Sequence, residues 1–166
     1  MNFNSLKEYF YTLYNACLLR LLIAMTLFLA IYYMSLSGMV SPYIQEESLV
    51  DFLRYSYLAL ILITLTIVHL EISRRLKSHS QVVGLGKKLD QYYFVVRLRM
   101  KTFLLISFFL ATGFFFTGHE WFTIYFAIMV IWFLFQWPSP GRVSIQLQLR
   151  GDERKMVMTK GEAFKF

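Results

Sequence analysis

The chain has 166 residues, of which 57% are hydrophobic, 19% aromatic and only 16% charged, whereas about 25% of the residues in an average soluble domain are charged. A soluble fold of this length could not cover so much apolar surface. The net charge of +7 does not indicate a nucleic-acid partner, because the basic residues flank long apolar runs. The composition predicts one all-α integral membrane protein, with four transmembrane helices and short amphipathic cytoplasmic elements.

The first predicted element is a short amphipathic helix over residues 1–18, which we expect to lie at the membrane interface. Its apolar residues recur at three- and four-residue steps on one face: Phe3, Leu6, Phe10, Leu13 and Cys17. Ser5 followed by Glu8 forms a capping box, a pattern typical of a helix start. A single cysteine excludes an intramolecular disulfide.

Residues 19–137 are predicted to form a four-helix transmembrane domain. Each of four apolar runs approaches the length that crosses about 30 Å of hydrocarbon, and none has a charged side chain in its middle. The predicted spans are residues 19–40, 52–72, 101–118 and 120–137. The two longer connections are the acidic segment 41–51 and a basic loop, 73–100.

The distribution of charge predicts the orientation. The connection after the first span contains Glu46, Glu47 and Asp51 and no basic residue, whereas residues 74–101 contain eight basic residues and one acidic residue. The positive-inside rule therefore predicts that both termini and the basic loop are cytoplasmic. The first residues do not resemble a secretory signal, so we expect a multi-pass protein of a bacterial cytoplasmic (inner) membrane.

The basic segment is the candidate contact site for anionic lipid headgroups or for a partner protein. Its members are Arg74, Arg75, Lys77, Lys87, Lys88, Arg97, Arg99 and Lys101. Residues 87–101 also fit an amphipathic helix continuous with the third span, although alternating Arg97, Arg99 and Lys101 would fit a strand.

The C-terminal tail, residues 138–166, is predicted to be cytoplasmic and allows two structures. Residues 142–150 alternate apolar and polar side chains, which favours a strand in a small hairpin with about 154–159. Alternatively, Ser139 followed by Pro140 is a good start for a helix.

Candidate chemistry is sparse. His69 and His119 fall near opposite ends of their spans, so they cannot share a metal or a haem, and no ligand spacing surrounds His79. The segment Gly84–Lys88 lacks the spacing of a phosphate loop. We therefore predict no metal, no cofactor and no catalytic residue. The polar side chains at the centres of the spans are hydroxyls: Thr26, Thr64, Thr66, Ser107 and Thr112.

The sequence favours a non-catalytic accessory, assembly or scaffold subunit of a membrane protein complex, because bulky apolar spans suit docking on other membrane subunits. Two alternatives remain open at this point. The hydroxyls could line an oligomeric pore or carrier, or His69, Glu71 and His79 could serve a membrane enzyme that acts on a lipid or quinone.

Overall fold

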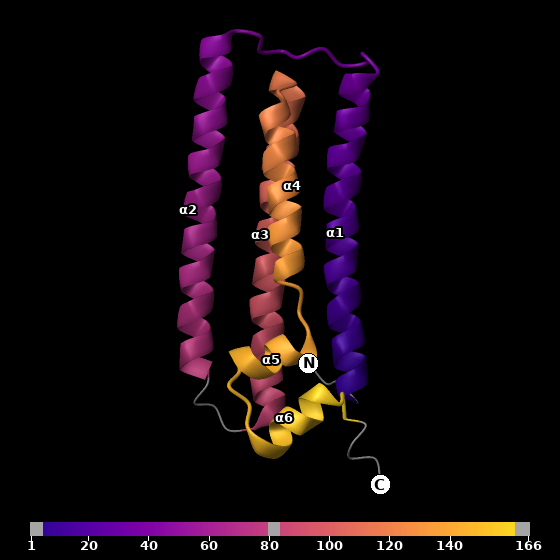
Figure 1. Cartoon of the computed structure of the whole chain (residues 1–166), viewed down its shortest axis with the longest axis vertical. Coiled ribbons are helices and arrows are strands. Elements are labelled where there is room, and N and C mark those ends of the chain that lie inside the picture. The colour runs from indigo at the N-terminus through magenta and orange to yellow at the C-terminus, as the bar shows by residue number, and fades with distance from the viewer. Residues whose placement is uncertain (1–4, 80–83, 162–166) are drawn as a thin grey trace. The chain divides into compact units, whose positions relative to one another are not determined.

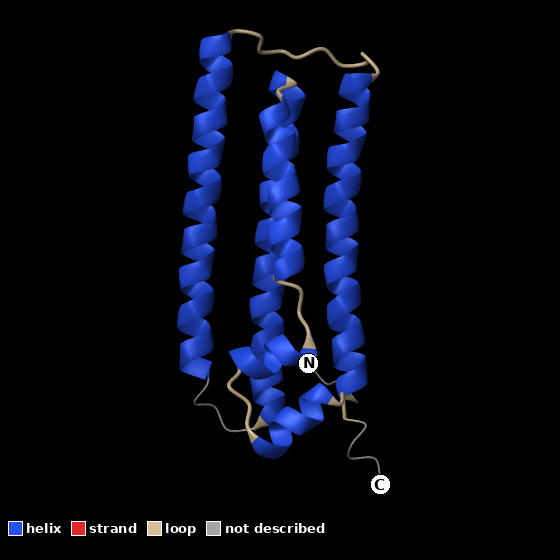
Figure 2. Ribbon diagram, viewed as in Figure 1, coloured by secondary structure: helices blue, strands red, loops and turns tan. Residues whose placement is uncertain are grey.

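The computed structural model describes residues 5–79 and 84–161 and shows six helices and no strand among them (Figures 1 and 2). The helices are α1 (Leu6–Leu36), α2 (Glu47–His79), α3 (Leu85–Thr117), α4 (Glu120–Phe135), α5 (Pro140–Gln146) and α6 (Gly151–Met158).

Three helices, α1, α2 and α3, are long and apolar enough to cross a membrane. A fourth span exists if α4 and α5 are counted together, although the chain bends by 79° between them. The protein is thus an all-α, multi-pass membrane protein with three to four spanning helices. The predicted all-α membrane class is confirmed, but a fourth span is not established, because α4 alone has 16 residues, or about 24 Å of helix.

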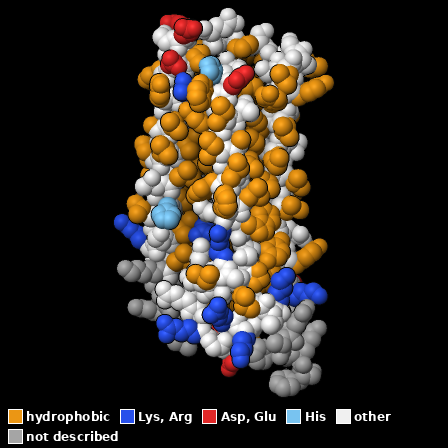
Figure 3. Space-filling model, in the orientation of Figure 1, with side chains coloured by type: hydrophobic (Ala, Val, Ile, Leu, Met, Phe, Trp, Pro, Cys, Tyr) orange, Lys and Arg blue, Asp and Glu red, His pale blue; other side chains and the backbone are white. Residues whose placement is uncertain are grey.

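The chain divides into two compact units. Unit 1 comprises residues 1–18, 68–99 and 137–166, and unit 2 comprises residues 19–67 and 100–136. The ranges of unit 1 contain fourteen of the seventeen Lys and Arg residues. On the face shown in Figure 3, hydrophobic side chains cover much of unit 2, as expected of a surface that meets lipid.

The core of unit 2 is built from aromatic rings on three helices. Phe28 of α1 stacks on Phe126 of α4 with ring centroids 4.0 Å apart, and it also contacts Phe114 of α3 at 5.7 Å. Phe103 of α3 stacks on Phe133 of α4 at 4.3 Å. Such pairs add specific geometry to the packing of large apolar surfaces, so α1, α3 and α4 form one packed group.

Gly113 allows α3 and α4 to approach closely. A Cβ atom added at this position would overlap the ring of Phe122, and the Phe122 side chain is fully buried. Small residues at helix contacts permit this kind of close packing within membranes.

The connection between α1 and α2 is fixed to the end of α3. The backbone N–H groups of Tyr43 and Ile44 both donate to the carbonyl of Phe116, at 2.9 and 3.0 Å. Pro42 packs on Gly118, which has a φ of +63° that favours glycine. This connection is therefore an ordered part of unit 2.

In unit 1, α1 starts as the sequence predicts. The Glu8 N–H donates to Ser5 Oγ at 3.2 Å, which confirms the N-cap. Phe10, Leu13 and Cys17 share a buried face, whereas Phe3 lies outside the described residues. Helix α1 runs without a break to Leu36, since no Gly or Pro interrupts it, and the limit between the two units falls within it, after Leu18.

The segment 73–100, predicted as a loop, is mostly helical. Helix α2 continues to His79, and α3 begins at Leu85 and runs without a break into its apolar part. The amphipathic helix predicted over 87–101 is confirmed, because Leu89, Tyr92, Val96 and Met100 are buried. The strand alternative is wrong.

The hairpin predicted in the tail is also wrong. Ser139 Oγ accepts a hydrogen bond from the Arg142 N–H at 3.2 Å, and Pro140 occupies the first turn of α5. Val143 and Leu147, four residues apart, are both buried, while Ile145 is 75% exposed. The alternating apolar residues are therefore also compatible with a helix that buries Val143 and Leu147 on one side. The N-cap at Ser139 favours this helix over the predicted strand.

We expect Gly113→Ala to lower the free energy of unfolding by about 1–3 kcal/mol, because the new methyl group would overlap the buried Phe122 ring. Thermal unfolding in detergent measures the change. The control is Gly86→Ala on α3, where a Cβ has no neighbour within 4 Å, and this variant should be neutral or slightly more stable. Equal stability of the two variants would contradict the close contact.

Candidate functional site

The structure divides the eight predicted basic residues into two groups. Four side chains are exposed: Arg74, Lys87, Arg97 and Lys101. Three others form hydrogen bonds with side chains of unit 1: Arg75, Lys88 and Arg99. The side chain of Lys77 lies outside the described part. The predicted set is therefore not a single uniform patch.

Arg75 and Lys88 have structural roles. Arg75 Nε lies 2.6 Å from Glu71 Oε1 on α2, and its guanidinium lies over the ring of Phe94 on α3. Lys88 Nζ of α3 donates to Glu153 Oε2 of α6 at 2.7 Å. These contacts join α2 and α6 to the first turns of α3.

The third contact belongs to an arginine cluster formed by α3 and α5. Arg99 Nη1 lies 3.4 Å from Gln146 Oε1, a long distance for an N–H···O bond. Arg142, one turn before Gln146 on α5, acts electrostatically on both Arg99 and Tyr92. The Tyr92 side chain is fully buried, and its hydroxyl has no hydrogen-bond partner in the described structure. Positive charge and an unsatisfied hydroxyl thus meet at one place.

Of these four residues, only Arg99 was predicted as a site residue from the sequence; Tyr92, Arg142 and Gln146 were not. The signal was present in the alternative helix prediction for the tail, because a helix that starts at Pro140 places Arg142 and Gln146 four residues apart on one face. That α5 packs beside Arg99 could not be derived from the helix pattern.

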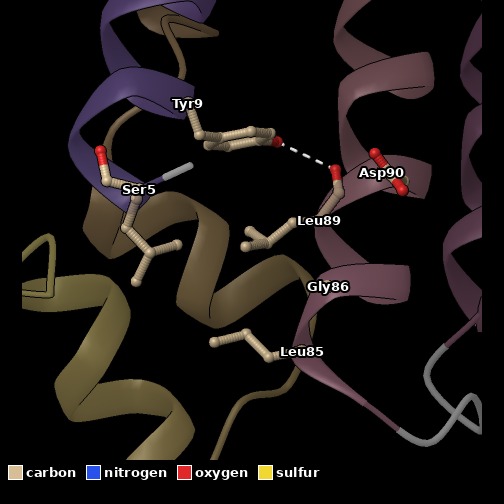
Figure 4. Close-up of a pocket in the computed structure, with 7 residues that line it drawn as sticks. Ser5, Tyr9, Leu85, Gly86, Leu89 and Asp90 are labelled. Atoms are coloured by element: carbon tan, nitrogen blue, oxygen red, sulfur yellow. Dashed lines mark hydrogen bonds between the residues drawn. The ribbon is translucent and has the colours of Figure 1, made fainter. Parts of the chain in front are cut away.

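A small pocket lies between the first turns of α1 and α3 in unit 1 (Figure 4). Its volume is about 230 Å³, and Leu85 and Leu89 point into the region beside Tyr9. The Tyr9 hydroxyl donates to the Leu89 carbonyl at 3.0 Å, so this bond fixes the ring between the helices. The pocket offers mainly apolar contact.

A second pocket, of about 490 Å³, lies in unit 2 beside the connection between α1 and α2, and Glu47, Asp51 and His119 contribute to its lining. His119 Nδ1 accepts a bond from the Trp121 N–H and thereby caps α4. No group of three His, Cys, Asp or Glu side chains in the described part is placed to hold a metal ion.

The arginine next to this pocket is held by neighbouring side chains. The Arg54 guanidinium lies 3.8 Å from the centroid of the Trp121 ring, and Nη1 lies 3.8 Å from Asp51 Oδ1. A cation over an aromatic face is stabilised by the ring quadrupole. Arg54 therefore fastens α2 to the start of α4.

Three of the five hydroxyl side chains considered as the lining of a pore form hydrogen bonds within their own helices. Thr64, Thr66 and Thr112 donate to the carbonyls of Leu60, Leu62 and Phe109. Ser107 is buried inside unit 2, and Thr26 is exposed. Among the proposed enzyme residues, His69 is exposed, Glu71 binds Arg75, and the side chain of His79 is outside the described part.

Comparisons with protein-family models, with curated proteins and with solved structures found no match to this chain. Its function must be inferred from its own residues, of which the arginine cluster and the surface of α2 are the most informative.

Loss of the Lys88–Glu153 ion pair should loosen α6. Lys88 is 14% and Glu153 33% exposed, so we expect Glu153→Gln to cost about 1–2 kcal/mol, between the values for exposed and buried pairs. Amide hydrogen exchange within α6 should become faster, because an eight-residue helix depends on packing for its stability.

The double variant that exchanges the two residues, Lys88→Glu with Glu153→Lys, should restore much of the protection of the α6 amides against hydrogen exchange. Lys87→Gln, which neutralises the exposed neighbouring lysine, is the matched control and should leave α6 unchanged. Protection that is insensitive to all of these substitutions would show that the pair does not hold α6.

Proposed function

We propose that this protein is a non-catalytic accessory, assembly or scaffold subunit of a membrane protein complex, and that α2 is the helix that packs against a transmembrane helix of another subunit. We place it in a bacterial cytoplasmic membrane, with both termini and unit 1 on the cytoplasmic side. The charge distribution supports this orientation, because basic segments are retained on the cytoplasmic face and contact anionic lipid there.

Helix α2 makes few contacts within its own chain. In the most apolar 18-residue stretch of each helix, 11% of residues are buried in α2, compared with 50% in α3. Its buried hydrophobic residues are Val50, Ile61 and Ile72. Each is eleven residues from the next, which is close to three helical turns, so all three lie on the same side of the helix. A single narrow side of α2 therefore faces the rest of the chain.

The opposite side of α2 carries an exposed row that we call the α2 outer stripe. It consists of Phe52, Ser56, Ala59, Ile63 and Thr66. The steps of four and three residues repeat every seven residues, as in helices that pack along a common seam. This row is the observation that carries the proposal.

The composition of the α2 outer stripe suits contact with a helix. Ser56, Ala59 and Thr66 are small, and small residues let helix backbones approach closely inside a bilayer, where lipid tails provide no hydrophobic drive for association. The Thr66 hydroxyl already donates to the Leu62 carbonyl at 2.8 Å, so burying it against a partner leaves no donor unsatisfied.

The proposal predicts that Ala59→Phe dissociates the complex, because a bulky ring holds the partner helix away. Overpacking of this kind costs about 1–3 kcal/mol, which corresponds to roughly five- to 150-fold weaker binding. The control is Leu58→Phe, since Leu58 lies about 120° around the helix from the centre of the α2 outer stripe and is three or four residues from none of its members.

A tagged chain expressed at its native level and extracted in mild detergent should migrate as a complex that contains at least one different polypeptide. The Ala59→Phe variant should shift toward the mass of the free chain, and Leu58→Phe should not. The proposal fails if the wild type migrates alone, if the complex contains only copies of this chain, or if both variants behave like the wild type.

A further inference from the structure

We propose that Arg99, Arg142 and Gln146 form a binding site for a phosphate group, with Tyr92 buried beside them. The ligand is a phosphate anion, either the headgroup of a phospholipid or a soluble phosphate compound. This site goes beyond the proposed packing of α2 and does not depend on it.

Two helices bring the groups together. Tyr92 and Arg99 lie seven residues, or about two turns, apart on one side of α3, and Arg142 and Gln146 lie about one turn apart on α5. Figure 1 shows α5 crossing the first half of α3, and the 3.4 Å distance between Arg99 Nη1 and Gln146 Oε1 establishes their proximity.

The α5 helix is held in position by its own sequence. Ser139 caps it, and Val143 and Leu147 bury its apolar side. Arg142 and Gln146 are half-buried, and both side chains extend from this anchored backbone. A binding site on such an anchored element is more precise than a site on a loose tail.

The electrostatics of the cluster favour an anion. The charged group that acts on Arg99 is another arginine, Arg142, and the remaining ionisable influence is Tyr92, which is neutral at pH 7. Two guanidinium groups of like charge, both partly removed from water, are stabilised when an anion enters between them.

The hydrogen-bonding capacity of the cluster is incompletely used. Arg99 has five N–H donors, and the bond to Gln146 is long. The buried Tyr92 hydroxyl also has no partner. A guanidinium can bind two phosphate oxygens at once, so phosphate fits the fork geometry better than a monatomic anion does.

The position of the cluster along α3 suits a phospholipid. The continuous apolar run of α3 begins at residue 102, three residues or about 4.5 Å of helix beyond Arg99. Basic side chains at the end of an apolar helix lie near the headgroup level of a membrane. Either source of phosphate would present the same group to the two arginines.

The test measures binding of phosphatidylglycerol, diacylglycerol and inorganic phosphate to the purified full-length protein in detergent, by native mass spectrometry and by ligand-dependent thermal shift. Phosphatidylglycerol should bind, and diacylglycerol, which lacks the phosphate, should bind at least about tenfold more weakly. Competition by inorganic phosphate would identify a soluble phosphate compound as a sufficient ligand, whereas binding of the phospholipid alone would identify the headgroup.

Arg99→Gln and Arg142→Gln should each weaken binding about tenfold, as expected for loss of a bidentate charged contact. The matched control is Arg97→Gln, which removes the same charge from an exposed position on the same turn of α3 and should change binding less than about twofold.

Thermal unfolding without ligand distinguishes binding from folding. Each variant of the cluster removes one of two neighbouring like charges, so the melting temperature of Arg99→Gln should be unchanged or raised. A lowered melting temperature with unchanged phosphate affinity would overturn the proposal. So would equal losses of affinity in Arg97→Gln and Arg99→Gln, or the absence of binding by both phosphate probes.

Discussion

Packing against α3 is the interaction on which the rest of this structure depends. In unit 2, α3 receives rings from α1 and α4, and its Phe116 carbonyl holds the connection between α1 and α2. In unit 1, its first turns bind α1 through Leu89, α6 through Lys88 and α5 through Arg99. The N-terminal half of this continuous helix therefore provides polar contacts, and its C-terminal half provides an apolar packing surface.

The contrast with α2 explains why partner binding is the favoured function. Half of the residues in the most apolar stretch of α3 are buried by its own chain, compared with 11% in α2. Helix α2 is attached at its start by Arg54 and Tyr57, which contact Trp121 and Phe122 of α4, and it leaves the α2 outer stripe exposed. Since lipid tails are as apolar as leucine, a helix gains stability in a bilayer mainly by close packing, and the small residues of the stripe provide a surface for it.

Charge is separated along the same helices. The aromatic rings of unit 2 carry no charge and need no counterion. The positively charged side chains of unit 1, in contrast, must be paired, hydrated or neutralised by an anion. Lys88 and Arg75 have carboxylate partners within the chain. Arg99 instead faces Arg142 and Gln146, which is why the same basic segment contains both structural ion pairs and a candidate ligand site.

The sequence by itself determined the helical membrane class, the buried side of residues 87–100 and the N-cap at Ser5, because apolar periodicity and capping chemistry are local properties. It did not decide between strand and helix in the tail, because Val143 and Leu147 fit both the two-residue repeat of a strand and the 3.6-residue repeat of a helix. The helix forms with Ser139 as its N-cap and with its apolar side packed against the rest of unit 1. Nor could it divide the basic segment into ion pairs, exposed charges and the arginine cluster. That division depends on which residues of α5 and α6 pack beside α3, and contacts between residues this distant in sequence exist only in the tertiary structure.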